Sequence, residues 1–192
     1  ICNIPEITDT EALCDILRAL NVDVKRASES IIINPSNMEN IEITEKYSKK
    51  LRASYYFMGA LLGKYKKVDM YFPGGCAIGA RPINLHLKGF EALGAEIVRG
   101  DNYVEAVAGP QGLIGETIYL DFPSVGATEN IILAACLANG ETQIKNAARE
   151  PEIADLANFL NKCGAKITGA GEGTVTITGV SSLQGSEYTI MP

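Results

Sequence analysis

The strongest constraint on the fold of this chain is a junction, repeated three times, at which an amphipathic helix ends and a strand begins. The three junctions are Leu20-Asn21-Val22, Leu93-Gly94-Ala95 and Cys163-Gly164-Ala165. They lie 73 residues (20 to 93) and 70 residues (93 to 163) apart. A second pair of matching segments, Arg52-Ala53-Ser54 and Gly126-Ala127-Thr128, has a similar offset of 74 residues (52 to 126). A period of this size indicates one supersecondary unit that is used several times.

Each unit is expected to contain a buried helix, a strand, an amphipathic helix and further strands. Apolar residues surround the helices expected at residues 48–66 and 126–138, which favours burial on more than one side. A capping-box pattern, Thr8-x-x-Glu11, opens the first helix, and Asn21 is its expected stop. The remaining helices are expected at residues 82–93 and 151–162. Strands are expected at residues 22–24, 31–33, 41–43, 68–72, 95–99, 104–108, 117–120, 142–145, 165–168, 174–178 and 188–191.

Composition restricts the classes of function. The 192 residues fit one domain, or one large half of a two-domain enzyme. A net charge of −6 without a basic block argues against nucleic acid as a partner. No apolar run reaches membrane-spanning length, so no membrane contact is expected. The five cysteines include no C-x-x-C pair, which favours a reducing cytoplasm over a disulfide framework or a zinc site.

A glycine-rich loop is expected between the strand at residues 68–72 and the helix at residues 82–93, and it carries Cys76 and Arg81. Glycines let a backbone approach a ligand closely, and a helix start offers free N–H groups to anions. A thiol five residues from a guanidinium is a candidate reactive group, because local positive charge favours the thiolate. The alternative is a glycine-rich turn that carries an incidental cysteine.

Residues 73–95, PGGCAIGARPINLHLKGFEALGA, resemble the active-site loop and following helix of the bacterial UDP-N-acetylglucosamine enolpyruvyl transferases. Three more stretches match in the same order: LRAS at residues 51–54, SVGAT at 124–128 and AAREPE at 147–152. The resemblance implies an α/β fold of repeated βαβαββ units, an inside-out α/β barrel with buried helices and outer sheets. It also implies a single domain over residues 1–192, with an N-terminal segment and a second domain missing.

The resemblance implies a reaction as well, the first committed step of peptidoglycan synthesis. The 3-hydroxyl of UDP-N-acetylglucosamine would add to C2 of phosphoenolpyruvate, and phosphate would leave, with no metal or organic cofactor. Cys76 would act as the general acid toward the methylene carbon. Arg81 and Arg52 would complete the catalytic set and bind the anionic substrates, because Arg makes bidentate bonds to carboxylates and phosphates.

The matched positions imply two substrate-binding runs. Pro82, Ile83, Asn84 and Leu85 align with the uridine-contacting run of the family, in which many relatives have Asp where this chain has Asn84. Ser124, Val125 and Gly126 align with a second nucleotide-contacting turn at a helix start. The alternative for Ser124 is an ordinary N-cap. The lone histidine, His86, is interpreted as structural.

Two other classes of function stay open. One is a non-catalytic repeat module that binds a nucleotide sugar or a protein. The other is a cysteine hydrolase or thiol redox protein that uses Cys76. We expect the 192-residue chain alone not to turn over, because the family draws a lysine from before Ile1, and an aspartate and further arginines from after Pro192. An apolar groove beside the helices at residues 48–66 and 126–138 would favour self-association.

Overall fold

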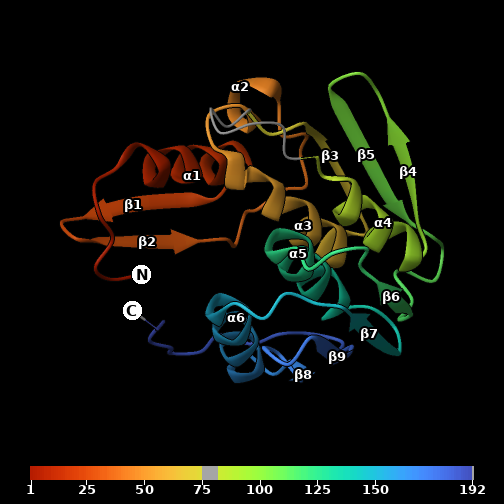
Figure 1. Ribbon diagram of the computed structural model, residues 1–192. Helices are drawn as coiled ribbons and strands as arrows, with labels where there is room; N and C mark the ends of the chain where they lie inside the picture. The colour runs from red at the N-terminus through yellow and green to blue at the C-terminus, as the bar shows by residue number, and fades with distance from the viewer. Residues whose placement is uncertain (75–81, 192) are drawn as a thin grey trace. The chain divides into compact units, whose positions relative to one another are not determined.

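The computed structural model describes residues 1–74 and 82–191 (Figure 1). Its helices are α1 (Thr8–Ala19), α2 (Glu45–Ser48), the 3-10 helix η1 (Arg52–Tyr55), α3 (Tyr56–Tyr65), α4 (Asn84–Ala92), α5 (Val125–Ala135) and α6 (Pro151–Lys162). Its strands are β1 (Asp23–Ala27), β2 (Ser30–Asn34), β3 (Lys67–Tyr71), β4 (Ala95–Arg99), β5 (Tyr103–Ala108), β6 (Thr117–Tyr119), β7 (Glu141–Lys145), β8 (Lys166–Thr168) and β9 (Thr174–Thr178). Groups of helices alternate with groups of strands along the chain, which is typical of an α/β protein.

The internal contacts of the chain divide it into two compact units. Unit 1 comprises Ile1–Met58, Val68–Arg81 and Val98–Glu105, and unit 2 comprises Gly59–Lys67, Pro82–Ile97 and Ala106–Pro192. The strands form sheets of order β1–β2, β3–β5–β4 and β6–β7–β9–β8, and the middle sheet contributes residues to both units. A single domain over residues 1–192 stays a prediction.

Unit 1 begins with α1 packed on the β1–β2 hairpin. The hairpin is antiparallel, with Asp23 opposite Asn34 and Ala27 opposite Ser30. The predicted capping box is wrong: the extended Ile7 is the N-cap of α1, and no side chain of the described residues caps this helix end. Thr8 is therefore already inside the helix, one residue too late to cap it.

The three repeated junctions have the backbone geometry that the sequence predicts. Asn21, Gly94 and Gly164 directly follow a helix with φ angles of 64°, 86° and 99°, the left-handed conformation that ends many helices. At the first junction the N–H of Val22 donates to the Leu17 carbonyl at 3.1 Å. At the third, the N–H of Ala165 donates to the Leu160 carbonyl at 3.0 Å, the same 6→1 bond. The repeat therefore exists in the structure as well as in the sequence.

Unit 2 is built around α5, none of whose residues is exposed. Helices α4 and α6 and strand β9 pack against it. In the four-stranded sheet, β6 pairs with β7 in parallel, and β9 pairs antiparallel with both β7 and β8. Gly169, Gly171 and Gly173 have positive φ angles between β8 and β9, which confirms the hairpin expected there. A nearly all-apolar helix is thus central, as its composition predicts.

Helices α3 and α5 approach each other closely, because two glycines of α3 lie against the backbone of α5. A Cβ on Gly59 would overlap the backbone oxygen and the side chain of Asn130. A Cβ on Gly63 would lie 3.2 Å from the Cα of Ala134 and from its carbonyl oxygen, which is tighter than ordinary contact. The spacing Gly-x-x-x-Gly places both glycines on one face of α3, one turn apart. This motif serves helix packing.

Three predicted elements differ in the structure. The helix predicted at residues 48–66 is divided into α2, η1 and α3, because the extended Leu51 interrupts it with φ −138° and ψ 121°. Residues 41–43 form no strand in the described chain, only an isolated bridge between Ile43 and Met70. Residues 188–191 form no strand either: the Tyr188 hydroxyl and the Met191 N–H both bond to Asp155 of α6, at 2.6 and 3.2 Å. The other predicted strands are confirmed, with ends shifted by up to three residues.

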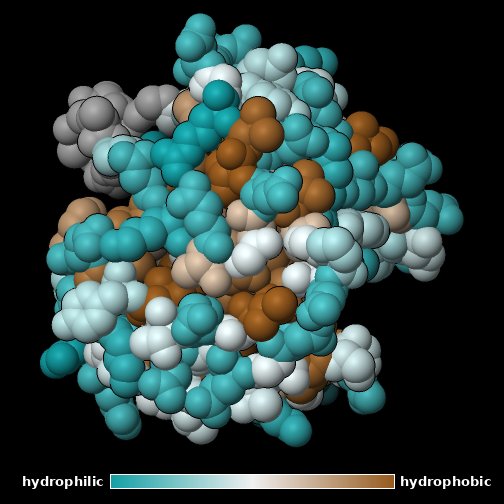
Figure 2. All heavy atoms as spheres, turned by 90° about the vertical axis from the view of Figure 1, so that its right-hand side faces the viewer, coloured by the Kyte–Doolittle hydropathy of each residue, from teal (hydrophilic) through white to brown (hydrophobic). Residues whose placement is uncertain are grey.

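The surface is largely hydrophilic on the face shown in Figure 2, with patches of apolar residues between polar ones. The large apolar side chains that are exposed lie outside α3 and α5; they are Ile1, Ile7, Leu13, Ile32, Ile41, Val98, Ile114, Tyr119, Phe122, Phe159, Ile190 and Met191. Self-association through a groove beside those two helices therefore stays a prediction. None of the helices in the described chain combines the length and apolarity that a bilayer crossing requires.

The close packing of α3 on α5 makes Gly59 sensitive to substitution. We expect Gly59→Ala to lower the free energy of unfolding by about 1–3 kcal/mol, because the added methyl group meets backbone that cannot move aside cheaply. Gly185→Ala is the matched control, since a Cβ there meets nothing within 4 Å. Urea unfolding of the two variants and the parent chain measures the difference. Equal stability of both variants would contradict the packing described here.

Candidate functional site

In unit 1 the start of the glycine-rich loop lies beside η1, the short helix that carries Arg52. The carbonyl oxygen of Ser48 accepts two hydrogen bonds, one from the Ser54 hydroxyl of η1 and one from the Gly74 N–H, both at 3.1 Å. A Cβ on Gly74 would overlap the Lys49 carbonyl, so only glycine fits at this position. The structure therefore brings together two segments that the sequence analysis treats as parts of one site.

Arg52 is half-buried, and its guanidinium lies 5.8 Å from the centre of the Tyr55 ring. An aromatic ring under the guanidinium attracts it and favours one orientation of its planar fork. Arg52 thus lies near an aromatic ring of the same short helix. Its predicted catalytic and substrate-binding role stays a prediction.

Cys76 and Arg81 lie outside the described residues. The other four cysteines are free thiols, and only Cys2 among them is exposed. Burial raises the pKa of the Cys136 thiol to about 12. Burial, with the nearby Glu11 carboxylate, also raises the pKa of Cys14. Neither buried thiol is suited to react as a thiolate near neutral pH.

In unit 2 the residues of the first predicted binding run, 82–85, are alternately exposed and buried. Ile83, the N-cap of α4, and Leu85 are buried, whereas Pro82 and Asn84 are exposed. The apolar pair fixes the start of α4 in the core of the unit. Only Pro82 and Asn84 therefore offer side chains to a ligand.

The second predicted run is the N-terminus of α5. Ser124 is its N-cap, and the Ser124 hydroxyl oxygen accepts a 3.4 Å bond from the Ala127 N–H. The first intrahelical bond runs from the Thr128 N–H to the Ser124 carbonyl at 2.9 Å. The N–H groups of Val125 and Gly126 precede that bond and have no acceptor within the helix, which is the arrangement that attracts phosphate. The N-cap role that the sequence left as an alternative is therefore present, and it is compatible with anion binding.

These two helix starts belong to packed helices. Asn130 of α5 lies 2.9 Å from His86 of α4, measured from amide nitrogen Nδ2 to ring nitrogen Nδ1. One turn further along α4, a Cβ on Gly89 would overlap the Ile131 side chain, so these helices also meet closely. Lys88 bonds to Asp121, just upstream of α5, at 2.8 Å. The structure thus brings the two predicted binding runs onto one pair of helices.

Sequence reasoning missed Asn130. Its signal was an amide next to the apolar run Ile131–Ala135, in a helix expected to be central. His86, by contrast, behaves as predicted: it is 6% exposed and bonded to another buried side chain. This burial argues against His86 as the general base that a cysteine hydrolase would need.

The matched stretch at residues 147–152 has a structural role. The N–H of Ala148 donates to the Thr128 hydroxyl of α5 at 3.1 Å, and the N–H of Ala147 donates to the Gly173 carbonyl at 3.0 Å. Glu150 is the N-cap of α6 and Pro151 its first residue, a position that proline favours. The stretch therefore joins α5, α6 and the β8–β9 hairpin.

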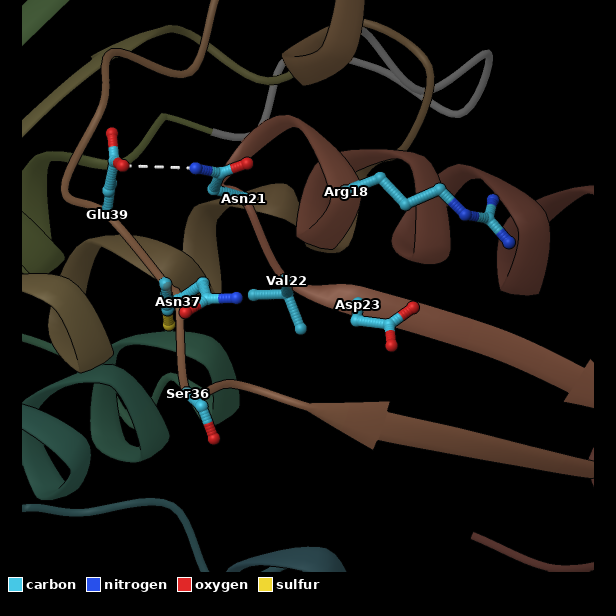
Figure 3. A pocket seen from close by; sticks show the side chains of 8 residues that line it. Arg18, Asn21, Val22, Asp23, Ser36, Asn37 and Glu39 are labelled. Carbon is cyan, nitrogen blue, oxygen red and sulfur yellow. Dashed lines mark hydrogen bonds between the residues drawn. The ribbon is translucent and has the colours of Figure 1, made fainter.

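A separate hollow of about 620 Å³ lies in unit 1 (Figure 3). Asn21 and Glu39 close one side of it through a 3.0 Å bond between Nδ2 and Oε1. Arg18 extends away from that pair. Its lining contains none of the predicted site residues and consists of Arg18, Asn21, Val22, Asp23, Ser36, Asn37, Met38 and Glu39. The described residues contain no group of three or more metal-ligating side chains either.

A family model described as EPSP synthase (3-phosphoshikimate 1-carboxyvinyltransferase) matches residues 1–192. The chain belongs to the EPSP synthase family. Within the family it is 50% identical over 192 residues to UDP-N-acetylglucosamine 1-carboxyvinyltransferase 2 of Carboxydothermus hydrogenoformans, covering 100% of this chain and 45% of the relative. It is also 50% identical to UDP-N-acetylglucosamine 1-carboxyvinyltransferase of Finegoldia magna, over 99% of this chain and 45% of the relative. The identity to UDP-N-acetylglucosamine 1-carboxyvinyltransferase 1 of Staphylococcus aureus is 50% as well, over 100% of this chain and 46% of the relative. The chain spans about half the length of these curated relatives.

Two solved structures have the same fold. The enolpyruvyl transferase NikO from Streptomyces tendae matches with a TM-score of 0.77 at 21% identity, over 94% of this chain and 43% of NikO. EPSP synthase from Acinetobacter baumannii matches with a TM-score of 0.69 at 21% identity, over 94% of this chain and 41% of that protein. The family resemblance and the enolpyruvyl transferase fold expected from the sequence are both confirmed.

The burial of three described thiols and the raised pKa of two of them allow the reactivity of Cys76 to be compared with theirs. We expect limited alkylation near neutral pH to label Cys76 first, with the exposed Cys2 as the internal comparison, while Cys14, Cys136 and Cys163 stay unmodified. The raised pKa values of Cys14 and Cys136 leave less thiolate to react. Mass-spectrometric mapping gives the order, and the unfolded chain, in which all five thiols should react, is the control. Preferential labelling of Cys14 or Cys163 would contradict this assignment.

Proposed function

We propose that this chain is the cysteine-loop part of a UDP-N-acetylglucosamine 1-carboxyvinyltransferase, which transfers the enolpyruvyl group of phosphoenolpyruvate to the nucleotide sugar in the first committed step of peptidoglycan synthesis. The observation that carries the proposal is 50% identity along the whole chain to relatives with that name. We also place the protein in the cytoplasm. The free thiols of the described cysteines support a reducing compartment.

The nucleotide sugar would bind at the paired helix starts of unit 2. The N–H groups of Val125 and Gly126 suit the diphosphate, since they lie at the positive end of the α5 dipole. Asn84 is exposed at the start of α4 and can donate to, or accept from, a base edge. Ile83 and Leu85 are buried, so their part in binding is limited to backbone groups and to holding the run in place.

In the proposed reaction the sugar 3-hydroxyl oxygen bonds to C2 of phosphoenolpyruvate, and the Cys76 thiol gives its proton to C3. A base outside residues 1–192 takes the hydroxyl proton. The C2–O bond to phosphate then breaks as C3 loses a proton, which restores the double bond and releases inorganic phosphate. Arg81 and Arg52 bind the negative charges of the substrates through bidentate contacts. Placement and proton transfer carry this chemistry without a metal or an organic cofactor.

The alternative is a module that binds the nucleotide sugar or a protein without turnover. The chain spans 45% of the length of its relatives, so binding and turnover need separate tests. The two candidates share the nucleotide site and differ only in the completeness of the catalytic groups.

Calorimetric titration with UDP-N-acetylglucosamine and an assay of phosphate release from phosphoenolpyruvate test both candidates. We expect the 192-residue chain to bind the nucleotide sugar without turnover, and a polypeptide of the relatives' full length to release phosphate. Each missing catalytic proton transfer costs about 10²–10⁴-fold in rate. Equal turnover by the two would overturn the proposed division of catalytic groups, and failure of the longer polypeptide to use the sugar would overturn the function.

The contribution of Arg81 can be measured in the longer polypeptide. We expect Arg81→Lys to weaken use of the nucleotide sugar by about ten- to a hundredfold, or roughly 1.5–3 kcal/mol, because lysine cannot form the bidentate fork. Arg99→Lys is the matched control, since Arg99 is exposed on β4 and belongs to no predicted run. Steady-state kinetics of both variants give the comparison. Equal effects of the two changes would exclude a substrate role for Arg81.

A further inference from the structure

Asn130 stands out among the buried side chains of unit 2. It lies in the middle of α5 with none of its surface exposed. A buried amide is costly unless its donor and acceptor groups are both used. Both are used here, and each reaches a different helix.

The amide orientation of Asn130 follows from its partners. The backbone N–H of Gly59 on α3 donates to Asn130 Oδ1 at 2.7 Å. A backbone N–H can only donate, so the atom that it meets must be the amide oxygen. The amide nitrogen Nδ2 is thereby directed at His86 Nδ1, 2.9 Å away on α4.

The histidine tautomer follows in turn. Nδ2 of Asn130 carries only donor hydrogens, so His86 Nδ1 must accept and be unprotonated. The neutral ring then carries its proton on Nε2. One asparagine therefore sets the protonation pattern of the single histidine of the chain.

The same contacts fix the mutual register of three helices. Asn130 bonds to α3 and α4 and is itself part of α5. Asn84, two residues before His86, begins α4, and Ser124 caps α5 six residues before Asn130. A shift of α4 along α5 would change the distance between the two predicted binding runs.

We propose that Asn130 is a positioning residue for the nucleotide-sugar site, holding His86 in the Nε2–H tautomer and the start of α4 in register with the start of α5. This inference rests on the proposed function. Asn130 touches no substrate in this role and acts through His86 and the helix backbones. The runs that it positions contact the nucleotide equally before and during reaction, so its loss should affect substrate binding more than the chemical step.

The first test is spectroscopic. Long-range 1H–15N spectra of the wild-type chain report the His86 ring without assignment, because it is the only histidine. We expect the pattern of a neutral ring protonated on Nε2. In Asn130→Asp a carboxylate faces Nδ1 and can only accept, so Nδ1 should become protonated. A wild-type ring protonated on Nδ1 would overturn the inference.

The second test is kinetic, in a polypeptide of the relatives' full length. We expect Asn130→Leu, similar in volume, to raise KM for UDP-N-acetylglucosamine by about ten- to a hundredfold with a smaller change in kcat, the size of effect that a misplaced contact produces. Asn161→Leu is the matched control. Asn161 of α6 also bridges elements, through both the N–H and the carbonyl of Ile167, but lies on neither predicted run.

The outcomes separate the inference from the proposed function. An unchanged KM in a folded Asn130→Leu variant, or an equal rise in Asn161→Leu, would overturn the positioning role alone. Failure of the wild-type polypeptide to use UDP-N-acetylglucosamine would overturn the proposed function and the positioning role together. If Asn130→Leu does not fold, Asn130→Asp takes its place in the kinetic test, with the same expected rise in KM, and an unchanged KM there would overturn the positioning role.

Discussion

The close approach of α3 to α5 is the contact on which unit 2 depends. Two glycines one turn apart on α3 leave room for the backbone of α5, and a methyl group at Gly59 would fill that room. Close packing in a protein interior allows little adjustment, so this contact sets where the remaining helices can lie. Helix α4 then meets the same central helix through another glycine, Gly89, against Ile131.

A polar contact sits at the centre of this apolar packing. An apolar side chain in place of Asn130 would remove the acceptor of the Gly59 N–H and the donor to His86 Nδ1, and a buried group that loses its partner costs about 1–3 kcal/mol. Dispersion between apolar side chains has little directional preference, whereas a hydrogen bond requires one distance and one angle. The amide therefore specifies a register that apolar packing alone would leave looser.

Much of the fold follows from the sequence because local rules and tertiary packing agree there. The junctions at Asn21, Gly94 and Gly164 end helices through backbone conformations that their residue types favour. The sequence fails where tertiary contacts override local pattern. The helix expected at residues 48–66 is interrupted at Leu51, next to the Ser48 carbonyl that accepts from both Ser54 and Gly74. Residues 188–191 read as a strand, but Asp155 binds them through the Tyr188 hydroxyl and the Met191 N–H.

The family, the repeated unit, the central position of α5 and the runs that could meet a nucleotide can all be predicted from the sequence alone, because periodicity and motif residues are local properties of the chain. Three features became visible only in the folded chain. The two runs begin a pair of packed helices, Pro82 and Asn84 are exposed while Ile83 and Leu85 are buried, and Asn130 joins three helices. These features depend on residues that are far apart along the chain. Gly59 and Asn130 lie 71 residues apart, and His86 and Asn130 lie 44 apart, so no local pattern carries their contact. Such contacts arise only when packing brings the helices together.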